Sequence, residues 1–101
     1  MKRRIGMKIK YAKVIENVGL HARPASIAVT EANKYNSDIT LHYMEKSASM
    51  KSIIQVMKLS VPVNGEIEIL CEGEDEKVAI EGIVAILEKK QIIQCIKNLS
   101  E

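Results

Sequence analysis

Aromatic side chains are scarce in this 101-residue chain, which has three tyrosines and neither phenylalanine nor tryptophan. Hydrophobic residues still make up 47% of it, so the core must be built from aliphatic residues, alanine and methionine. The scarcity argues against a platform for single-stranded nucleic acid, because bases stack on flat side chains. A chain of this length has room for one compact domain.

Long hydrophobic runs are absent too. No apolar stretch reaches the roughly 18 residues of a membrane span, and the basic start MKRRIGMK is not followed by the apolar part of a secretory signal. We therefore expect a cytoplasmic protein that does not insert into a membrane. Cysteine is rare as well: Cys71 and Cys95 form no metal-ligand pattern and are expected to be free thiols.

Charge of one sign is also lacking, because the net charge is only +2. Three of the cations, Lys2, Arg3 and Arg4, fall in residues 1–6, which we interpret as a disordered leader; without them the chain has 12 basic and 13 acidic residues. A balance this mild does not indicate direct binding to nucleic acid. No metal or cofactor site is predicted.

Hydrophobic periodicity predicts the order β-α-β-β-α-β-α. Alternating residues predict strands at 8–15, 38–44 and 66–72, and a weaker strand at 46–50 that pairs with the second as a hairpin. Apolar residues at helical spacing predict helices that begin near Pro24, Ser52 and Asp75. Strands and helices interleaved in so short a chain favour an α+β open-faced sandwich.

The last part of the chain, residues 91–101, reads as a C-terminal extension. Ile92, Ile93, Ile96 and Leu99 have helical spacing, but the polar residues 89–91 break the phase of the preceding helix. We therefore predict a bend or a second short helix. Its apolar side packs either on its own domain or on another copy of the chain, so the protein is expected to be a monomer unless this extension forms a dimer.

The segment Gly19-Leu20-His21-Ala22-Arg23-Pro24-Ala25 has a pattern that suits chemistry. A turn delivers a histidine, which is a nucleophile, to the first residue of a helix. The free N–H groups of a helix start favour an anion, and Arg23 adds a fork for phosphate oxygens. These features suit a transient phosphohistidine at His21. On the residues alone, the alternative that His21 merely caps the helix and Arg23 is a solvated charge stays open.

GLHARPA resembles the active-site motif of the histidine-containing phosphocarrier protein HPr of the sugar phosphotransferase system. The resemblance runs from about Tyr11 to Leu87 and includes KYNSDITL after the first helix and KSIIQVMKL at the second. It implies an HPr-like phosphocarrier domain over 7–90, with a four-stranded antiparallel sheet and three helices on one face. A small-molecule-binding module of similar layout would leave both motifs unexplained.

The resemblance also implies a role as a phosphoryl relay rather than a complete enzyme. In the family, the motif histidine accepts a phosphoryl group on Nδ1 from the phosphoenolpyruvate-dependent enzyme I and passes it to sugar-specific enzyme II A components. His21 matches that histidine, and Arg23 matches the arginine that steadies the phosphate. The partners then perform most of the catalysis.

A second resemblance lies at Lys51-Ser52-Ile53-Ile54. In low-GC Gram-positive members, the serine that opens the second helix is phosphorylated by HPr kinase/phosphorylase, and the product acts with a carbon-catabolite transcription factor. Ser52 matches that serine. The helix dipole stabilises a negatively charged phosphate at a helix start, although an unmodified Ser52 would also serve as an ordinary N-cap. A regulatory paralogue that acts mainly through phospho-Ser52 is therefore the alternative function.

A docking face for partners is expected beside His21. Val56 and Leu59 share an inward phase on the second helix, and an apolar patch beside a reactive group indicates an interface. The family uses this part of the second helix and the outer side of the first. The residues expected there are Ser26, Ile27, Thr30, Ile53, Ile54 and Met57; burial of some of them in the core remains the alternative.

The sequence departs from the family pattern at three positions. Val18 stands where the family commonly has Ser or Asn to orient the imidazole, so either Asn17 substitutes or that hydrogen bond is missing. Gln55 replaces a glycine on the second helix, and Lys58 replaces a small polar residue. These changes bear on the identity of the partner more than on the fold.

Overall fold

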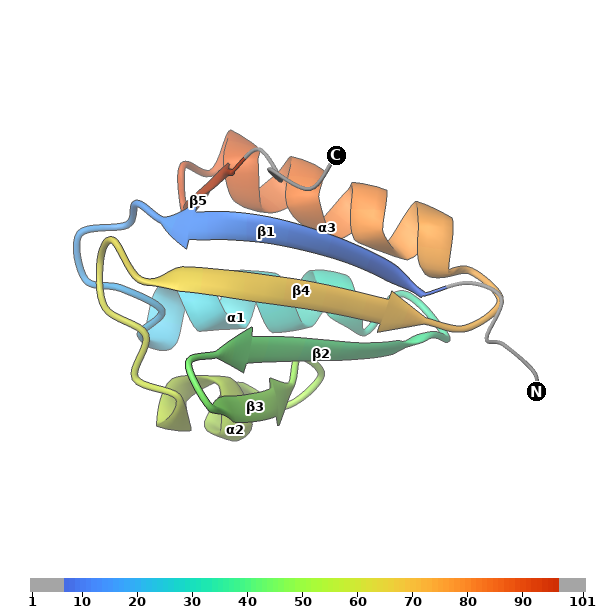
Figure 1. Ribbon diagram of the computed structural model, residues 1–101, viewed down its shortest axis with the longest axis horizontal. Coiled ribbons are helices and arrows are strands. Elements are labelled where there is room, and N and C mark those ends of the chain that lie inside the picture. The colour runs from blue at the N-terminus through green and yellow to red at the C-terminus, as the bar shows by residue number, and fades with distance from the viewer. Residues whose placement is uncertain (1–6, 97–101) are drawn as a thin grey trace.

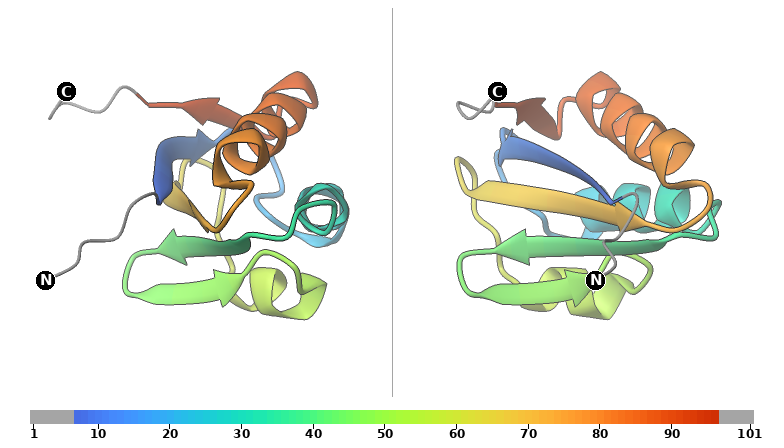
Figure 2. Two further views of the ribbon diagram at one scale, coloured as in Figure 1. Left: turned by 90° about the vertical axis from the view of Figure 1, so that its right-hand side faces the viewer. Right: turned by 45° about the vertical axis from the view of Figure 1, so that its right-hand side comes forward.

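Five strands form one antiparallel sheet, and three helices cover one of its faces while the other face stays open (Figure 1 and Figure 2). The computed structural model describes residues 7–96. The elements, in chain order, are β1 Lys8–Val14, α1 Ala22–Ala32, β2 Asp38–Tyr43, β3 Lys46–Ser49, α2 Ile53–Lys58, β4 Glu66–Glu72, α3 Glu76–Lys89 and β5 Ile93–Cys95.

The strand order β3-β2-β4-β1-β5 places the first strand beside the fourth. Lys10 of β1 pairs with Ile69 of β4, and Leu41 of β2 pairs with the same Ile69 from the other side. β4 is therefore the strand between β1 and β2, and the helices return the chain across one face of the sheet. The predicted α+β open-faced sandwich with its helices on one face is confirmed.

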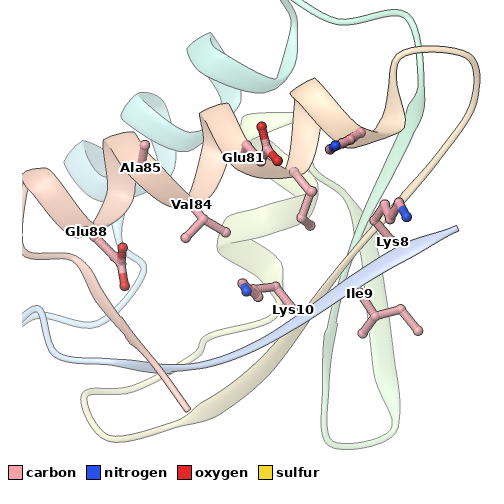
Figure 3. Close-up of a pocket in the computed structure, with 9 residues that line it drawn as sticks. Lys8, Ile9, Lys10, Glu81, Val84, Ala85 and Glu88 are labelled. Carbon is pink, nitrogen blue, oxygen red and sulfur yellow. The ribbon is translucent and has the colours of Figure 1, made fainter. Parts of the chain in front are cut away.

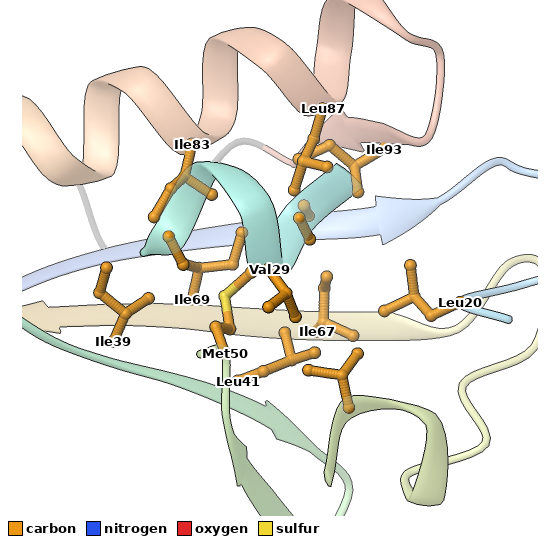
Figure 4. Close-up of a cluster of buried hydrophobic side chains, with 14 of the residues drawn as sticks. Leu20, Val29, Ile39, Leu41, Met50, Ile67, Ile69, Ile83, Leu87 and Ile93 are labelled. Carbon is orange, nitrogen blue, oxygen red and sulfur yellow. The ribbon is translucent and has the colours of Figure 1, made fainter. Parts of the chain in front are cut away.

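The core lies between that face of the sheet and the helices (Figure 4). Along β4, Ile67, Ile69 and Cys71 are buried, whereas the alternate Glu66 lies exposed on the open face, as a half-buried strand requires. Aliphatic residues, alanine and one methionine fill the space, which agrees with the scarcity of aromatic residues. Burial of a side chain such as Ile69 stabilises the fold by about 1.5–3 kcal/mol.

Within residues 7–96 the sheet has five strands where four were predicted, because residues 93–95 form β5 and not a helix. After α3 the chain reverses at Gln91, whose φ is +60°, and the predicted bend is thereby confirmed. The Ile92 N–H donates to the Leu87 carbonyl (2.8 Å), which closes a Schellman turn. β5 then pairs with the outer edge of β1, with Ile93 opposite Val14 and Cys95 opposite Ala12.

Ile92 and Ile93 pack into the domain's own core, with 1% and 2% of their surface exposed. Of the two alternatives for the apolar side of the extension, packing on its own domain therefore holds for these two residues. Leu99 and the predicted leader, residues 1–6, lie outside the described residues. Both cysteines are free, as expected. Within residues 7–96, no helix is long and apolar enough to cross a membrane.

Asp75 is the N-cap residue of α3, but its side chain makes no cap hydrogen bond. Its carboxylate instead accepts hydrogen bonds from the Asn36 and Ser37 amides (2.9 Å each) and from the Ser37 hydroxyl. The Ser37 hydroxyl, followed by the Asn36 amide, holds the pKa of Asp75 below its ordinary value. The contact ties the loop before β2 to the start of α3.

Candidate functional site

His21 lies exposed at the N-cap of α1, at the end of a loop that the backbone holds firmly. Gly19 has φ +71°, and a Cβ there would lie 2.3 Å from the Val61 carbonyl oxygen, so no other residue fits without a shift of the chain. The following amide, of Leu20, donates to that same carbonyl (2.9 Å). The position of His21 therefore depends on the segment that precedes β4.

The contact with Val61 anchors one end of the loop before α1, and a second backbone contact anchors the other end. The amides of Ile15 and Glu16 both donate to the Ile92 carbonyl, at 2.8 and 3.3 Å. Because Ile92 is itself buried, this anchor is fixed by the core. The loop before α1 is thus held between the segment before β4 and the turn before β5. These elements all meet at the end of the molecule where α1 begins (Figure 1).

The first turn of α1 suits a phosphoryl group bound to His21. Ala22 and Arg23 lie in this turn, where backbone N–H groups have no acceptor within the helix. Pro24 is buried at the third position and fixes the turn. Arg23 is exposed, and its guanidinium can reach phosphate oxygens in a bidentate manner. Among the described residues, neither His21 nor Asn17 has a side-chain hydrogen bond, so the missing family contact is not replaced by Asn17.

Ser52 is the N-cap of α2, and its hydroxyl accepts a hydrogen bond from the Gln55 amide (3.2 Å). The Gln55 side chain reaches back to accept from the Ser49 amide (3.0 Å). The glutamine that departs from the family pattern therefore closes the turn before Ser52, in the manner of a capping box. The Ser52 side chain remains partly accessible.

The residues expected on the docking face are accessible to different degrees. Ile54 is 70% exposed and Ile53 is 40% exposed, so an apolar patch faces solvent on α2. Val56 and Leu59 are buried, as their phase predicted. Thr30 is exposed, Ser26 is half-buried, and Ile27 and Met57 pack partly against the core. Burial, the alternative considered for this set, thus applies in part to Ile27 and Met57.

His21 and Ser52 lie near opposite ends of α1. His21 precedes its first residue, whereas Asn33, just after its last residue, donates to the carbonyl of Lys51 next to Ser52 (3.4 Å). Eleven helical residues separate the two ends, which corresponds to about 16 Å of rise. The two candidate phosphorylation sites therefore border a common face formed by α1 and α2 and do not touch each other.

A hollow in the surface lies between α3 and the beginning of β1 (Figure 3). It measures about 440 Å³, and Ile80 and Val84 form part of its wall. Lys8 and Lys10 line it near the start of β1, whereas His21 follows the end of that strand, about 20 Å further along. Within residues 7–96, no three His, Cys, Asp or Glu side chains gather to hold a metal ion.

A smaller hollow of about 330 Å³ lies beside the first turn of α1 and involves residues that the sequence did not single out. Arg23 and Ile27 line it together with Glu16 and Lys90. Glu16 comes from the loop before His21, and Lys90 from the end of α3. No local pattern marks either residue, because their proximity to Arg23 depends on the turn that leads into β5.

The family model described as the phosphorylation site of the HPr component of the phosphotransferase system (PTS) matches residues 9–89. The histidine-containing phosphocarrier protein of a mycoplasma is 38% identical, covering 86% of this chain and 99% of its own, with a TM-score of 0.84. The HPr of Bacillus anthracis is 36% identical over 80% of this chain and 96% of its own, with a TM-score of 0.74.

The chain belongs to the HPr family. Members of this family are phosphocarriers rather than catalysts in their own right. The HPr-family fold also occurs in Crh of Bacillus subtilis, a catabolite repression protein described as an intertwined, swapped dimer. Crh is 32% identical over 93% of this chain and 99% of its own, with a TM-score of 0.65. Both phosphocarriers and a catabolite repression protein are therefore similar to this HPr-family chain.

Proposed function

We propose that this HPr-family protein carries phosphoryl groups on His21 between enzyme I and sugar-specific enzyme II A components in the cytoplasm of a bacterium. The observation that carries the proposal is the exposed imidazole at the start of α1, two residues before an exposed arginine. A lone pair of the imidazole attacks the phosphorus of phosphorylated enzyme I, so the N–P bond to His21 forms as the bond between phosphorus and enzyme I breaks; the acceptor then attacks the same phosphorus and displaces His21. The protein supplies a positioned nucleophile and a docking face.

The roles of the other site residues follow from their positions. Arg23 and the free amides of the first turn stabilise the phosphoryl oxygens on His21. Partners dock over the outer side of α1 and the exposed part of α2. The residues proposed for this docking face are Ser26, Ile27, Thr30, Ile53, Ile54 and Met57.

Incubation with enzyme I and radiolabelled phosphoenolpyruvate tests the relay. We expect an acid-labile phosphate on the wild-type protein and none on His21→Ala. Arg23→Gln, which keeps a polar side chain of similar length, should label slowly. Equal labelling of His21→Ala and the wild type would reject His21 as the acceptor. Transfer from the labelled protein to an enzyme II A component then tests the second half of the relay.

A regulatory role through phospho-Ser52 is the second candidate function. The likeness to Crh favours it, and so does Ser52 at the N-cap of α2, where a phosphate agrees with the helix dipole. The modified residue would place charge beside Ile53 and Ile54 and so weaken apolar docking by relay partners. HPr kinase/phosphorylase and a catabolite-control transcription factor are the partners of this role.

The assay for this role uses HPr kinase/phosphorylase with labelled ATP. We expect an acid-stable phosphate that disappears in Ser52→Ala, while the neighbouring Ser49→Ala variant stays labelled. A label that survives in Ser52→Ala would exclude this serine. Because the His21 phosphate is acid-labile and the serine phosphate is acid-stable, one sample tests both functions.

A further inference from the structure

The smaller hollow, of about 330 Å³, is built from three separate segments. The loop before His21 contributes Val18, α1 contributes Ile27, and the turn after α3 contributes Ile92. Because Ile92 is buried and its carbonyl anchors that loop, the walls belong to the rigid part of the molecule. The hollow is therefore a formed feature of the surface beside the first turn of α1.

Three charged residues line this hollow: Arg23, Lys90 and Glu16. Among residues 7–96, none of the three forms an ion pair or a side-chain hydrogen bond with another described residue. Two cations against one carboxylate leave a net positive charge in a concave site, where low-dielectric walls focus the potential. An oxyanion is the ligand that such a site attracts.

The backbone of Lys90 is held in place, although Lys90 is the C-cap of α3. Its amide donates to the Ile86 carbonyl (3.0 Å), and the next two amides, of Gln91 and Ile92, donate to the Glu88 and Leu87 carbonyls. This hydrogen-bonded turn prevents the helix end from fraying. Lys90 therefore lines the hollow from a fixed backbone after α3, and Arg23 lines it from α1.

We infer that Lys90 and Arg23 form a two-cation site for a phosphate oxyanion, with Lys90 as a binding residue that the active-site motif does not contain. The inference deepens the proposed function and rests on it where the oxyanion is the phosphoryl group on His21. Free inorganic phosphate has the same chemistry and is the other source. Glu16 opposes both cations and limits the affinity of the unmodified protein for free anions.

The first experiment titrates inorganic phosphate into the full chain at constant ionic strength and follows backbone amide shifts of residues 15–24. We expect Lys90→Gln to weaken binding roughly two- to fivefold, the range of an exposed ion pair. The matched control is Lys89→Gln, which removes the same charge from the neighbouring position and should bind as the wild type does. Glu16→Gln should bind more tightly.

The second experiment labels His21 with enzyme I and follows the phosphorus resonance of the phosphoprotein against pH. A nearby cation favours the dianionic phosphoryl group, so its titration midpoint should move to higher pH in Lys90→Gln. It should stay unchanged in Lys89→Gln and move to lower pH in Glu16→Gln. A purely structural role for Lys90 would not move this midpoint, and thermal unfolding checks that each variant is folded.

The outcomes separate the inference from the function on which it rests. The two-cation site is rejected if inorganic phosphate leaves the amide shifts of the wild type unchanged and Lys90→Gln leaves the titration midpoint of the phosphoprotein unchanged. It is also rejected if Lys90→Gln behaves as Lys89→Gln does in both experiments. Either result counts even when His21 is labelled normally. If His21 accepts no label, the proposed relay fails, and the phosphate titration alone then decides on the site. An effect confined to the phosphoprotein assigns the site to the bound phosphoryl group.

Discussion

Replacement of Gly19 by alanine tests whether the backbone of the loop before α1 positions His21. The new methyl carbon would lie 2.3 Å from the Val61 carbonyl oxygen, and that atom already accepts the Leu20 amide. The new methyl group and the Val61 carbonyl cannot both keep these positions. The substitution should therefore separate the loop from the segment before β4 and move His21 away from its place at the helix start.

The free energy of unfolding should fall by about 2–3 kcal/mol. A positive φ costs a residue with a Cβ about 1–2 kcal/mol, and the loss of the Leu20 hydrogen bond adds roughly 0.5–1.5 kcal/mol. In a domain of this size, 1 kcal/mol shifts the melting temperature by about 4–8 °C, so the midpoint should fall by about 10–20 °C. Thermal unfolding followed by circular dichroism measures this shift.

The functional assay is the initial rate of His21 labelling by enzyme I at a temperature where the variant is folded. We expect a slower rate for Gly19→Ala. Gly82→Ala is the matched control, since a Cβ there meets the Tyr35 hydroxyl near the far end of α1 and should leave the labelling rate unchanged. A Gly19→Ala protein as stable and as readily labelled as the wild type would refute the anchoring argument.

Three further predictions concern stability and thiol chemistry. Met44 has φ +58° in the two-residue hairpin turn and is 79% exposed, so Met44→Gly should raise the unfolding free energy by about 0.5–1 kcal/mol in urea titrations; a loss would contradict this. Asp75→Asn should melt below the wild type at pH 7. Because the folded protein lowers the pKa of Asp75, calorimetry should show that gap closing as pH falls below 3.8; a constant gap would count against the Ser37 contact. Burial raises the pKa values of Cys71 and Cys95 to about 11, so iodoacetamide should modify both slowly at pH 8 until urea unfolds the chain; rapid native modification would be inconsistent with that burial.

The order of elements through α3 and the position of His21 could be predicted because local signals carry them. Alternating residues mark the first four strands, and Val56 and Leu59 reveal the buried side of α2 by their phase. The motif around His21 predicted a helix start, and the structure places His21 at the N-cap. These features depend on residues that are close together in the chain.

The rest depends on partners that are distant in sequence. The spacing of Ile92, Ile93 and Ile96 is helical, but residues 93–95 form β5 because the edge of β1 offers them a hydrogen-bonded ladder. Gln91 adopts a positive φ without being glycine, so the break in helical phase at residues 89–91 indicated the bend, but no turn residue marked its position. Asp75 is the N-cap residue of α3, yet its carboxylate binds amides in the loop before β2, which the local sequence does not reveal.

The two anchors of the loop before α1 also set the order in which function can appear during folding. Val61 and Ile92 lie far along the chain from His21, so the loop is anchored at both ends only when the segments before β4 and β5 are in place. Contacts between distant segments form late, because closing long loops is entropically costly. The loop that presents His21, the proposed phosphoryl acceptor, is therefore complete only in the fully folded chain, and we expect a partly folded chain to be a poor substrate for enzyme I.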